Sequence, residues 1–520
     1  EEGEEGEEGE EEEEFTPVDI HVAIMLLGVV ALVMILFTLV NAWDDDIRRY
    51  TWVVISNVLS IFIAVLMFTC FNDWVSYYSK GASELQASGI QYLCLLFYMI
   101  VLQLVIAYLS GVRCEGKTHN LNDEVWVYAD ALRGDYEMEV FDESKVRTKI
   151  KDGKKTDKSV IIVNDKGVER EVYCALKTIN LDKRKRVMKC WATLFAHIAG
   201  FASIYSGGRM QQTSYFRSSP LMTCVPIIIN QAFVMFMFWV FNLTRENEKQ
   251  KALAEGRKAL RARLFDEEVE DAENDISALG ISFLFTQVIR FQVGGYLPNM
   301  EGLVFVAHPA WYCLVLFGVA LVWLIMAVCF AVAKSKMEEE TASRRLMAIF
   351  ASASGMSMAW CILWGTRAAF SDVYILNHLH EGVTTMMGRI LMSITLTLAV
   401  VCCIFILDPI DDNLNTGEDG SAGTEVVATI IEAMGVLVGF SWEHSFDGGV
   451  EAIASVSPHK KLVATALTIF VFCAIVPAWR SYILTKAMQL EGYKNEGERD
   501  EYGVSSRDTG GETEVQMLIP

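Results

Sequence analysis

Residues 51–72 read TWVVISNVLSIFIAVLMFTCFN, and after a short polar loop residues 89–111 read GIQYLCLLFYMIVLQLVIAYLSG. Each stretch is long and apolar enough to cross a bilayer, which takes about 20 mostly apolar residues. The first stretch carries Ser56, Ser60 and Ala64 at every fourth position, whereas the second is bulky throughout. Because small residues mark the faces on which membrane helices pack closely, we interpret the pair as a transmembrane hairpin with an inner and an outer helix.

The same unit recurs four more times along the chain. We predict further small-residue helices at 187–206, 275–294, 343–366 and 424–443, with bulky partners at 220–243, 306–333, 381–407 and 460–485. A lone helix at 20–42 precedes them all. The sequence therefore predicts an all-α polytopic membrane protein of about eleven spans, one lone helix followed by five tandem hairpins whose inner helices run in parallel.

Composition agrees with membrane insertion. The 520 residues are 52% hydrophobic, and the mean hydropathy is +0.30. The net charge of −22 is concentrated at the start, where the first 14 residues contain 11 glutamates. We expect a disordered acidic tail over 1–19, either simply solvated or loosely binding divalent cations. A chain that begins with Glu suits removal of an N-terminal segment.

Two polar segments interrupt the spans, which we group as 20–111, 187–244 and 275–486. In the first, 112–186, residues 123–180 alternate apolar and polar side chains in the manner of strands and predict a small β-rich insertion on the inner side. Residues 245–274 predict a charged helix, which either is solvated or contacts lipid headgroups or a protein partner. A polar C-terminal tail follows at 487–520.

Lysine and arginine are unevenly divided between the two sets of loops. Most lie in the loops on one side, and the opposite loops hold few: Lys80, Arg209, Arg217, Arg367, Lys460 and Lys461. By the positive-inside rule the basic side is cytoplasmic or its organellar equivalent. With eleven spans the N-terminus then lies outside or in a lumen, and the C-terminus lies inside.

Several ionisable or polar residues fall inside predicted spans, where burial in hydrocarbon is costly and often functional. Glu432 shares a helical face with small residues, and Arg389 lies at a similar depth in the preceding span. This predicts an Arg389–Glu432 pair, which serves either ion passage or helix register. His197, Arg290 and Asn230 are the other candidates for lining a transport pathway.

The outer ends of the five inner helices are polar. They carry Asp73, Arg209, Arg367, Glu443 and His444, close to tryptophan and glycine residues. If these ends converge they form an outer vestibule with charges of both signs. The alternative interpretation is interfacial, because Trp, Arg and Gly are common where a helix leaves the membrane.

Other classes of site find little support in the sequence. The twelve cysteines lack a CxxC pair, so we expect neither disulfides nor a zinc site, and we predict no metal site or cofactor. The acidic stretch 408–420 departs from the EF-hand pattern and is interpreted as a polar connection. We recognise no catalytic constellation and predict no enzyme, and no nucleic-acid partner. The expected partners are membrane lipids and further copies or other membrane subunits.

Two functions remain. The first is a channel or transporter for a small ion, a proton or another cation, with a pathway among the five small-residue helices. The second is a non-conducting membrane scaffold or subunit, in which the buried charges only fix packing.

Overall fold

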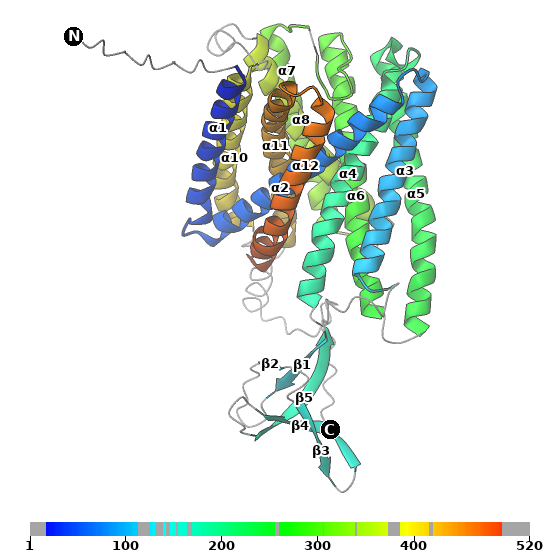
Figure 1. The fold of residues 1–520 in the computed structure, drawn as a ribbon, viewed down its shortest axis with the longest axis vertical. Helices are drawn as coiled ribbons and strands as arrows, with labels where there is room; N and C mark the ends of the chain where they lie inside the picture. Colours follow the sequence, from blue (N-terminus) through cyan, green and yellow to red (C-terminus); the bar gives the residue numbers. More distant parts are fainter. Residues whose placement is uncertain are drawn as a thin grey trace, which may run out of the picture. The chain divides into compact units, whose positions relative to one another are not determined.

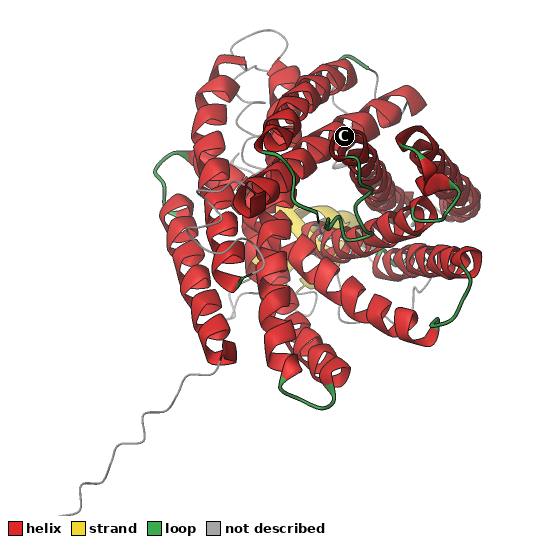
Figure 2. Ribbon diagram, turned by 90° about the horizontal axis from the view of Figure 1, so that it is seen from above, coloured by secondary structure: helices red, strands yellow, loops and turns green. Residues whose placement is uncertain are grey.

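The computed structural model describes residues 17–112, 181–254, 259–304, 306–337, 341–372, 385–414 and 420–490, together with the strand residues 124–129, 139–141, 146–151, 154–163 and 169–179. Within this part of the chain, eleven helices are long and apolar enough to cross a membrane. The number agrees with the predicted eleven spans and identifies a polytopic helical membrane protein. Figure 2 shows the helices seen from above, with described loops in green joining some of them.

The helices follow the chain order shown in Figure 1. They are α1 (Pro17–Val40), α2 (Asp45–Tyr78), α3 (Glu84–Leu109), α4 (Leu181–Gln211), α5 (Pro220–Ala254), α6 (Ala259–Gly294), α7 (Ala310–Ser335), α8 (Ala342–Asp372), α10 (Met386–Leu414), α11 (Gly420–Ser455) and α12 (Lys460–Ala478). A π-helical turn, η3 (Trp479–Ile483), continues α12 after Pro477, and a 3-10 turn, η2 (Phe216–Ser218), precedes α5.

Burial divides the helices into two groups. In the most apolar stretch of α2, α4, α6, α8 and α11, between 56% and 72% of the residues are buried. In α1, α3, α5, α7, α10 and α12 the share is between 11% and 44%. The first group contains the five helices that carry small residues in the sequence, and the second contains the bulky ones. Small residues thus accompany protein contact, and bulky residues accompany exposure.

α11 contacts many other helices. It packs against α1, α2, α7, α8, α10 and α12. Close approach depends on glycine: a Cβ atom at Gly435 would lie 2.7 Å from Asn57 of α2, and one at Gly355 of α8 would lie 3.3 Å from Ala433. On α4, a Cβ atom at Gly200 would lie 2.6 Å from Leu279 of α6. The small residues therefore mediate contacts between inner helices.

Contacts also cross the boundaries of the predicted hairpins. α7 packs extensively on α8, and α10 on α11, although the hairpin assignment puts each pair in different units. Sequence neighbours in separate hairpins are thus also neighbours in space.

Between α3 and α4 lie five strands, β1 (Glu124–Ala129), β2 (Glu139–Phe141), β3 (Val146–Lys151), β4 (Lys154–Val163) and β5 (Glu169–Ile179). They form an antiparallel sheet in the order β2-β1-β5-β4-β3. Trp126 pairs with Phe141, and Val160 pairs with Val172. The register shifts between Val127 and Tyr128, as in a β-bulge.

The chain divides into two compact units. One contains residues 1–101, 193–241 and 270–487, and the other contains 102–192, 242–269 and 488–520. In the second unit, Arg245 pairs with Asp266 at 3.1 Å. The cavity and the charged clusters described below all belong to the first unit.

Three boundaries differ from the sequence prediction. α10 begins at Met386 and continues to Leu414, so the polar connection predicted from residue 408 onward begins inside a helix. α11 continues twelve residues beyond 443, the predicted end of the last inner helix. The predicted charged helix 245–274 is shared between α5, which reaches Ala254, and α6, which begins at Ala259. The acidic tail up to residue 16 and the tail after residue 490 lie outside the described residues.

Candidate functional site

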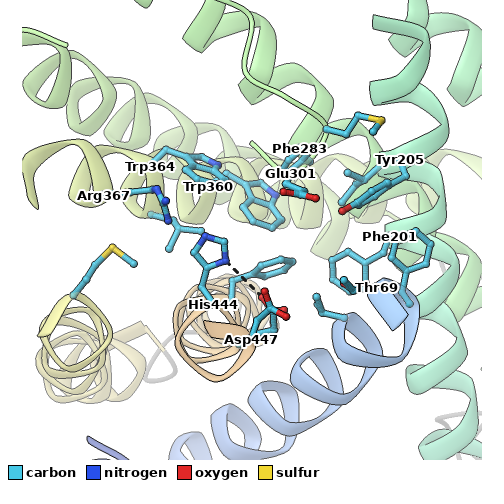
Figure 3. Close-up of a pocket in the computed structure, with 18 residues that line it drawn as sticks. Thr69, Phe201, Tyr205, Phe283, Glu301, Trp360, Trp364, Arg367, His444 and Asp447 are labelled. Atoms are coloured by element: carbon cyan, nitrogen blue, oxygen red, sulfur yellow. Dashed lines mark ion pairs between the residues drawn. The ribbon is translucent and has the colours of Figure 1, made fainter. Parts of the chain in front are cut away.

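A cavity of about 130 Å³ lies inside the first unit (Figure 3). Side chains from α2, α4, α6, α8 and α11 line it, together with Met392 of α10 and the loop between α6 and α7. All five helices of the more buried group therefore meet at this cavity. At this cavity the inner helices bring aromatic and charged side chains together.

Aromatic rings form a continuous wall around the cavity. Phe68 of α2 lies 6.3 Å from Phe201 of α4, measured between ring centroids, and Phe201 lies 5.2 Å from Phe440 of α11. Phe440 lies 4.4 Å from Trp360 of α8, which in turn lies 5.0 Å from Phe283 of α6. Most of these contacts are edge-to-face, a favourable geometry for aromatic rings. The rings thus connect all five inner helices.

α11 contributes the densest group of ionisable side chains. Glu443 and Asp447 are four residues apart and so lie on one helical face. The carboxylate of Glu443 is 3.9 Å from Nδ1 of His444. Arg389 of α10 donates from Nη1 to the main-chain oxygen of His444 at 3.1 Å. A guanidinium and two carboxylates are therefore brought together where α10 meets α11.

A third carboxylate comes from the loop between α6 and α7. Glu301 is held there because the side-chain oxygen of Asn299 accepts hydrogen bonds from the main-chain N–H groups of Glu301 and Leu303, at 3.0 Å and 2.7 Å. Arg290 donates to the main-chain oxygen of Gly302 at 2.7 Å. Gly302 has φ +82°, and a Cβ atom there would overlap the Trp364 ring, so this turn requires glycine.

The Glu301 carboxyl lies at the edge of the cavity, outside the membrane-spanning stretches. Burial raises the pKa of Glu301, and the nearby negative charge of Asp73 raises that pKa further. Glu301 therefore takes up a proton at a higher pH than a fully solvated glutamate does. A bound cation would oppose this effect.

The side of the cavity formed by α8 provides two donors without acceptors. Nε1 of Trp364 and Nη1 of Arg367 are buried and have no hydrogen-bond partner among the described residues. Cζ of Arg290 lies over the Trp364 ring, 4.3 Å from the ring centroid. Cζ of Arg367 lies 6.0 Å from the same centroid. Buried donors are nearly always bonded in folded proteins, so two unsatisfied ones at one cavity are unusual.

Three of the five predicted vestibule residues border the cavity, namely Arg367, Glu443 and His444. The other two do not. Asp73 is exposed, and its main-chain oxygen accepts a hydrogen bond from Lys461 at 3.2 Å. Arg209 is half-buried at the end of α4. The predicted vestibule residues thus come together only in part.

The predicted pair of Arg389 with Glu432 does not form. Arg389 lies beside His444, and Glu432 precedes His444 by twelve residues of the same helix. At about 1.5 Å per residue the separation along the axis is roughly 18 Å. The prediction placed Arg389 and Glu432 at a similar depth by counting residues from the predicted ends of their spans. It failed because α11 extends beyond its predicted end at 443. Glu432 is half-buried and outside the cavity.

The remaining pathway candidates do not line the cavity either. Asn230 accepts from the hydroxyl of Ser206 at 3.0 Å and donates to that of Ser203 at 2.9 Å, and so joins α5 to α4. Arg290 anchors the loop that carries Glu301. His197 is buried in α4, and its Nδ1 has no hydrogen-bond partner among the described residues.

Sequence reasoning missed Glu301 and Asp447. Glu301 belongs to a loop, and its position depends on hydrogen bonds to Asn299 that no spacing rule indicates. Asp447 was excluded because the predicted helix ended at 443. The signal for it was present: Glu443 and Asp447 have the spacing of one helical turn.

A second charged cluster lies where α2 meets α10. Asp411 is 1% exposed, and its Oδ2 accepts from Nη2 of Arg49 at 3.3 Å and from the hydroxyl of Tyr50. Arg49 also pairs with Asp46 at 2.9 Å. Side-chain oxygens of Asp44, Asp46 and Asp408 lie within 4.8 Å of one another nearby. Asp411 is thus buried in an ion pair, although the sequence predicts a polar connection between helices at 408–420.

No family model, curated protein or solved structure matches the chain. The class of protein defined by fold and site is an integral membrane protein, with eleven apolar helices among the described residues and a charged, aromatic-walled cavity between its inner helices.

Proposed function

We propose that the chain is a membrane channel or transporter for a small ion, a proton or another cation, with a pathway through the cavity of α2, α4, α6, α8 and α11. One observation carries the proposal: every inner helix contributes to a single cavity that contains ionisable side chains. Charged groups inside membrane spans are costly to bury and commonly line ion or substrate pathways.

The charges of the cavity favour a cation over an anion. Glu301, Glu443 and Asp447 offer three carboxylates, whereas Arg367 is the guanidinium among the lining residues. Arg389 adds a second guanidinium close by, through its bond to the His444 carbonyl. Carboxylates and aromatic faces both attract cations. The proposed function is transport without catalysis.

The proposal includes an orientation and an arrangement. The acidic N-terminus faces the outside or a lumen, the C-terminus and the insertion 112–186 face the cytoplasmic side, and the inner helices derive from five tandem hairpins. The uneven division of Lys and Arg between loops supports the orientation. The contrast in burial between inner and outer helices supports the arrangement. Lipids contact the outer helices, and further copies or other membrane subunits remain proposed partners.

Flux measurements in liposomes test this proposal. The purified full chain is reconstituted with a proton gradient or a monovalent-cation gradient, and flux is followed with a pH or cation dye across a pH series. We expect flux in the native protein and a reduction of at least about tenfold in Glu443→Gln, because the variant removes a cavity charge and keeps the side-chain shape.

Glu432→Gln is the matched control, since both glutamates belong to α11 and Glu432 lies outside the cavity. It should leave the flux unchanged. Equal losses in both variants would place the pathway elsewhere on α11. Folded native protein that conducts no ion under any gradient would eliminate the transport proposal.

The alternative function, a non-conducting scaffold or subunit, has its own supporting observation. Two buried polar residues within spans form hydrogen bonds to other parts of the fold. Asn230 bonds to α4, and Arg290 bonds to the loop between α6 and α7. In a scaffold such groups only fix packing. Absence of flux together with co-purification of a stoichiometric membrane subunit would favour this function.

A further inference from the structure

We infer that the cavity binds a small zwitterion, a single molecule that carries both an ammonium group and a carboxylate. The inference deepens the proposed function, on which it rests, by naming the cation as one end of an organic solute. It depends on the separation of donors and acceptors around the cavity, on the aromatic wall between them and on the cavity volume.

The anionic end of such a ligand would be bound by α8. Nη1 of Arg367 and Nε1 of Trp364 are both buried donors without partners among the described residues, and Trp364 is only 5% exposed. The two residues are three positions apart on one helix, so a single carboxylate can reach both. Guanidinium and carboxylate groups form strong charge-assisted hydrogen bonds, which would satisfy Arg367.

The cationic end would be bound across the cavity. In the view of Figure 3, Arg367 and Trp364 lie on one side, Glu301 and Tyr205 lie on the other, and Asp447 lies between and below them. Neither Arg367 nor Asp447 forms an ion pair with a described residue. Arg367 and Asp447 thus carry opposite charges in one cavity without pairing with each other, and a ligand with both charges matches that separation.

Simpler ligands match the cavity less well. An inorganic anion would satisfy Arg367 but would be repelled by three carboxylates. A bare metal ion or proton would satisfy the carboxylates but leave the donors of Arg367 and Trp364 unbonded. The aromatic rings are a favourable surface for an alkylammonium group.

The volume limits the size of the ligand. An apolar cavity of about 150 Å³ admits a molecule the size of benzene. The observed cavity of about 130 Å³ therefore suits a ligand of roughly five or six non-hydrogen atoms. Glycine and β-alanine have this size and both charges.

Isothermal titration of the purified full chain with glycine, β-alanine and 4-aminobutanoate, and separately with propylammonium and propanoate, tests the inference. At least one zwitterion should bind about tenfold or more tightly than either singly charged compound, because each of those leaves one set of cavity groups unsatisfied. This comparison uses the native protein and does not depend on how any variant folds.

Two variants then identify the anionic end. Arg367→Gln and Trp364→Phe should each weaken zwitterion binding, by about tenfold or more for the guanidinium and less for the indole. Arg209→Gln and Trp74→Phe are matched controls outside the cavity, and neither should change binding.

The outcomes separate this inference from the proposed function. Equal binding of propylammonium and the zwitterions, or no binding by any zwitterion, overturns the inference, and ion flux that depends on Glu443 would still support transport. Zwitterion binding that depends on Arg367 supports the inference, even if liposomes show no flux and the transport proposal fails.

Discussion

The two buried charged regions of the first unit differ in one respect: Asp411 and Arg49, where α2 meets α10, form an ion pair, whereas Arg367 and Asp447 of the cavity form none with a described residue. Asp411 is enclosed by Arg49 and Tyr50, and Arg49 also bonds Asp46. In the cavity, Arg367 and Asp447 have no ion-pair partner among the described residues.

We interpret the paired charges as groups that stabilise the fold, and the unpaired charges of Arg367 and Asp447 as groups that bind a ligand. A buried ion pair whose partner is removed leaves an uncompensated charge, and the cost is large. A buried charge that is already unpaired contributes nothing favourable to the fold, so its removal costs little. Stability and ligand binding should therefore respond in opposite ways to mutation in the two regions.

The largest effect on stability is expected at the paired cluster. Asp411→Ala removes the buried acceptor of Arg49 and Tyr50 and should lower the free energy of unfolding by about 3 kcal/mol, the lower end for a broken buried pair because Asp46 remains. Chemical or thermal unfolding in detergent measures this loss. Asp45→Ala is the control: it breaks an exposed pair with Arg48 on the same helix and should cost under about 1 kcal/mol.

Arg290 lies next to the cavity, but its guanidinium is hydrogen-bonded to neighbouring groups, unlike the Nη1 donor of Arg367. Arg290→Met keeps the length of the side chain but loses the bonds to Gly302, Gln287 and Tyr312. We expect a loss of about 2 kcal/mol in the free energy of unfolding, as for hydrogen bonds from a charged donor. Unchanged stability would mean that the loop carrying Glu301 does not depend on this anchor.

Arg367→Gln should behave differently from both. Because no ion pair is broken, the free energy of unfolding should change by less than about 1 kcal/mol, while zwitterion binding is lost. Parallel unfolding and titration experiments on the same preparation measure both quantities. A loss of stability as large as that of Arg290→Met would assign Arg367 to packing and remove the contrast between the two regions.

The smallest effect is expected at Glu301 and depends on pH. The folded state raises the pKa of this carboxyl, so above the ordinary pKa of glutamate the folded state binds more protons than the unfolded state does. Stability from this group therefore falls as pH rises from the ordinary pKa to the raised one. Glu301→Gln should raise the melting temperature slightly at pH 8 and leave it unchanged at pH 4. A difference that is the same at both values would contradict the cited cause.

The number of spans could be predicted from the sequence, because each needs a long apolar run and the runs are separated by charged loops. Which helix of each of the five pairs is the more buried could also be predicted. Gly200, Gly355 and Gly435 contact neighbouring inner helices as their spacing indicates. Helix ends were less predictable. Glu443, His444 and Asp447 resemble a helix terminus in sequence, yet they lie inside a helix that continues to Ser455 and borders a cavity.

The cavity residues were only partly predictable for a related reason. Residue counts give the depth of a side chain in the membrane but not the direction in which its helix faces, so Arg389 was assigned to Glu432 and not to the carbonyl of His444. Glu301 reaches the cavity through a loop whose path depends on Asn299 and Gly302. Such a path follows from tertiary contacts, which local patterns do not contain.

The central position of α11 has a consequence for how the sequence can vary over evolution. A helix that contacts α1, α2, α7, α8, α10 and α12 and also borders the cavity has few positions at which a larger side chain can be accommodated. α12, with 17% of its apolar stretch buried, has many. In any set of related chains, α11 should therefore diverge slowly and α12 quickly, so α11 offers the best probe for detecting distant relatives.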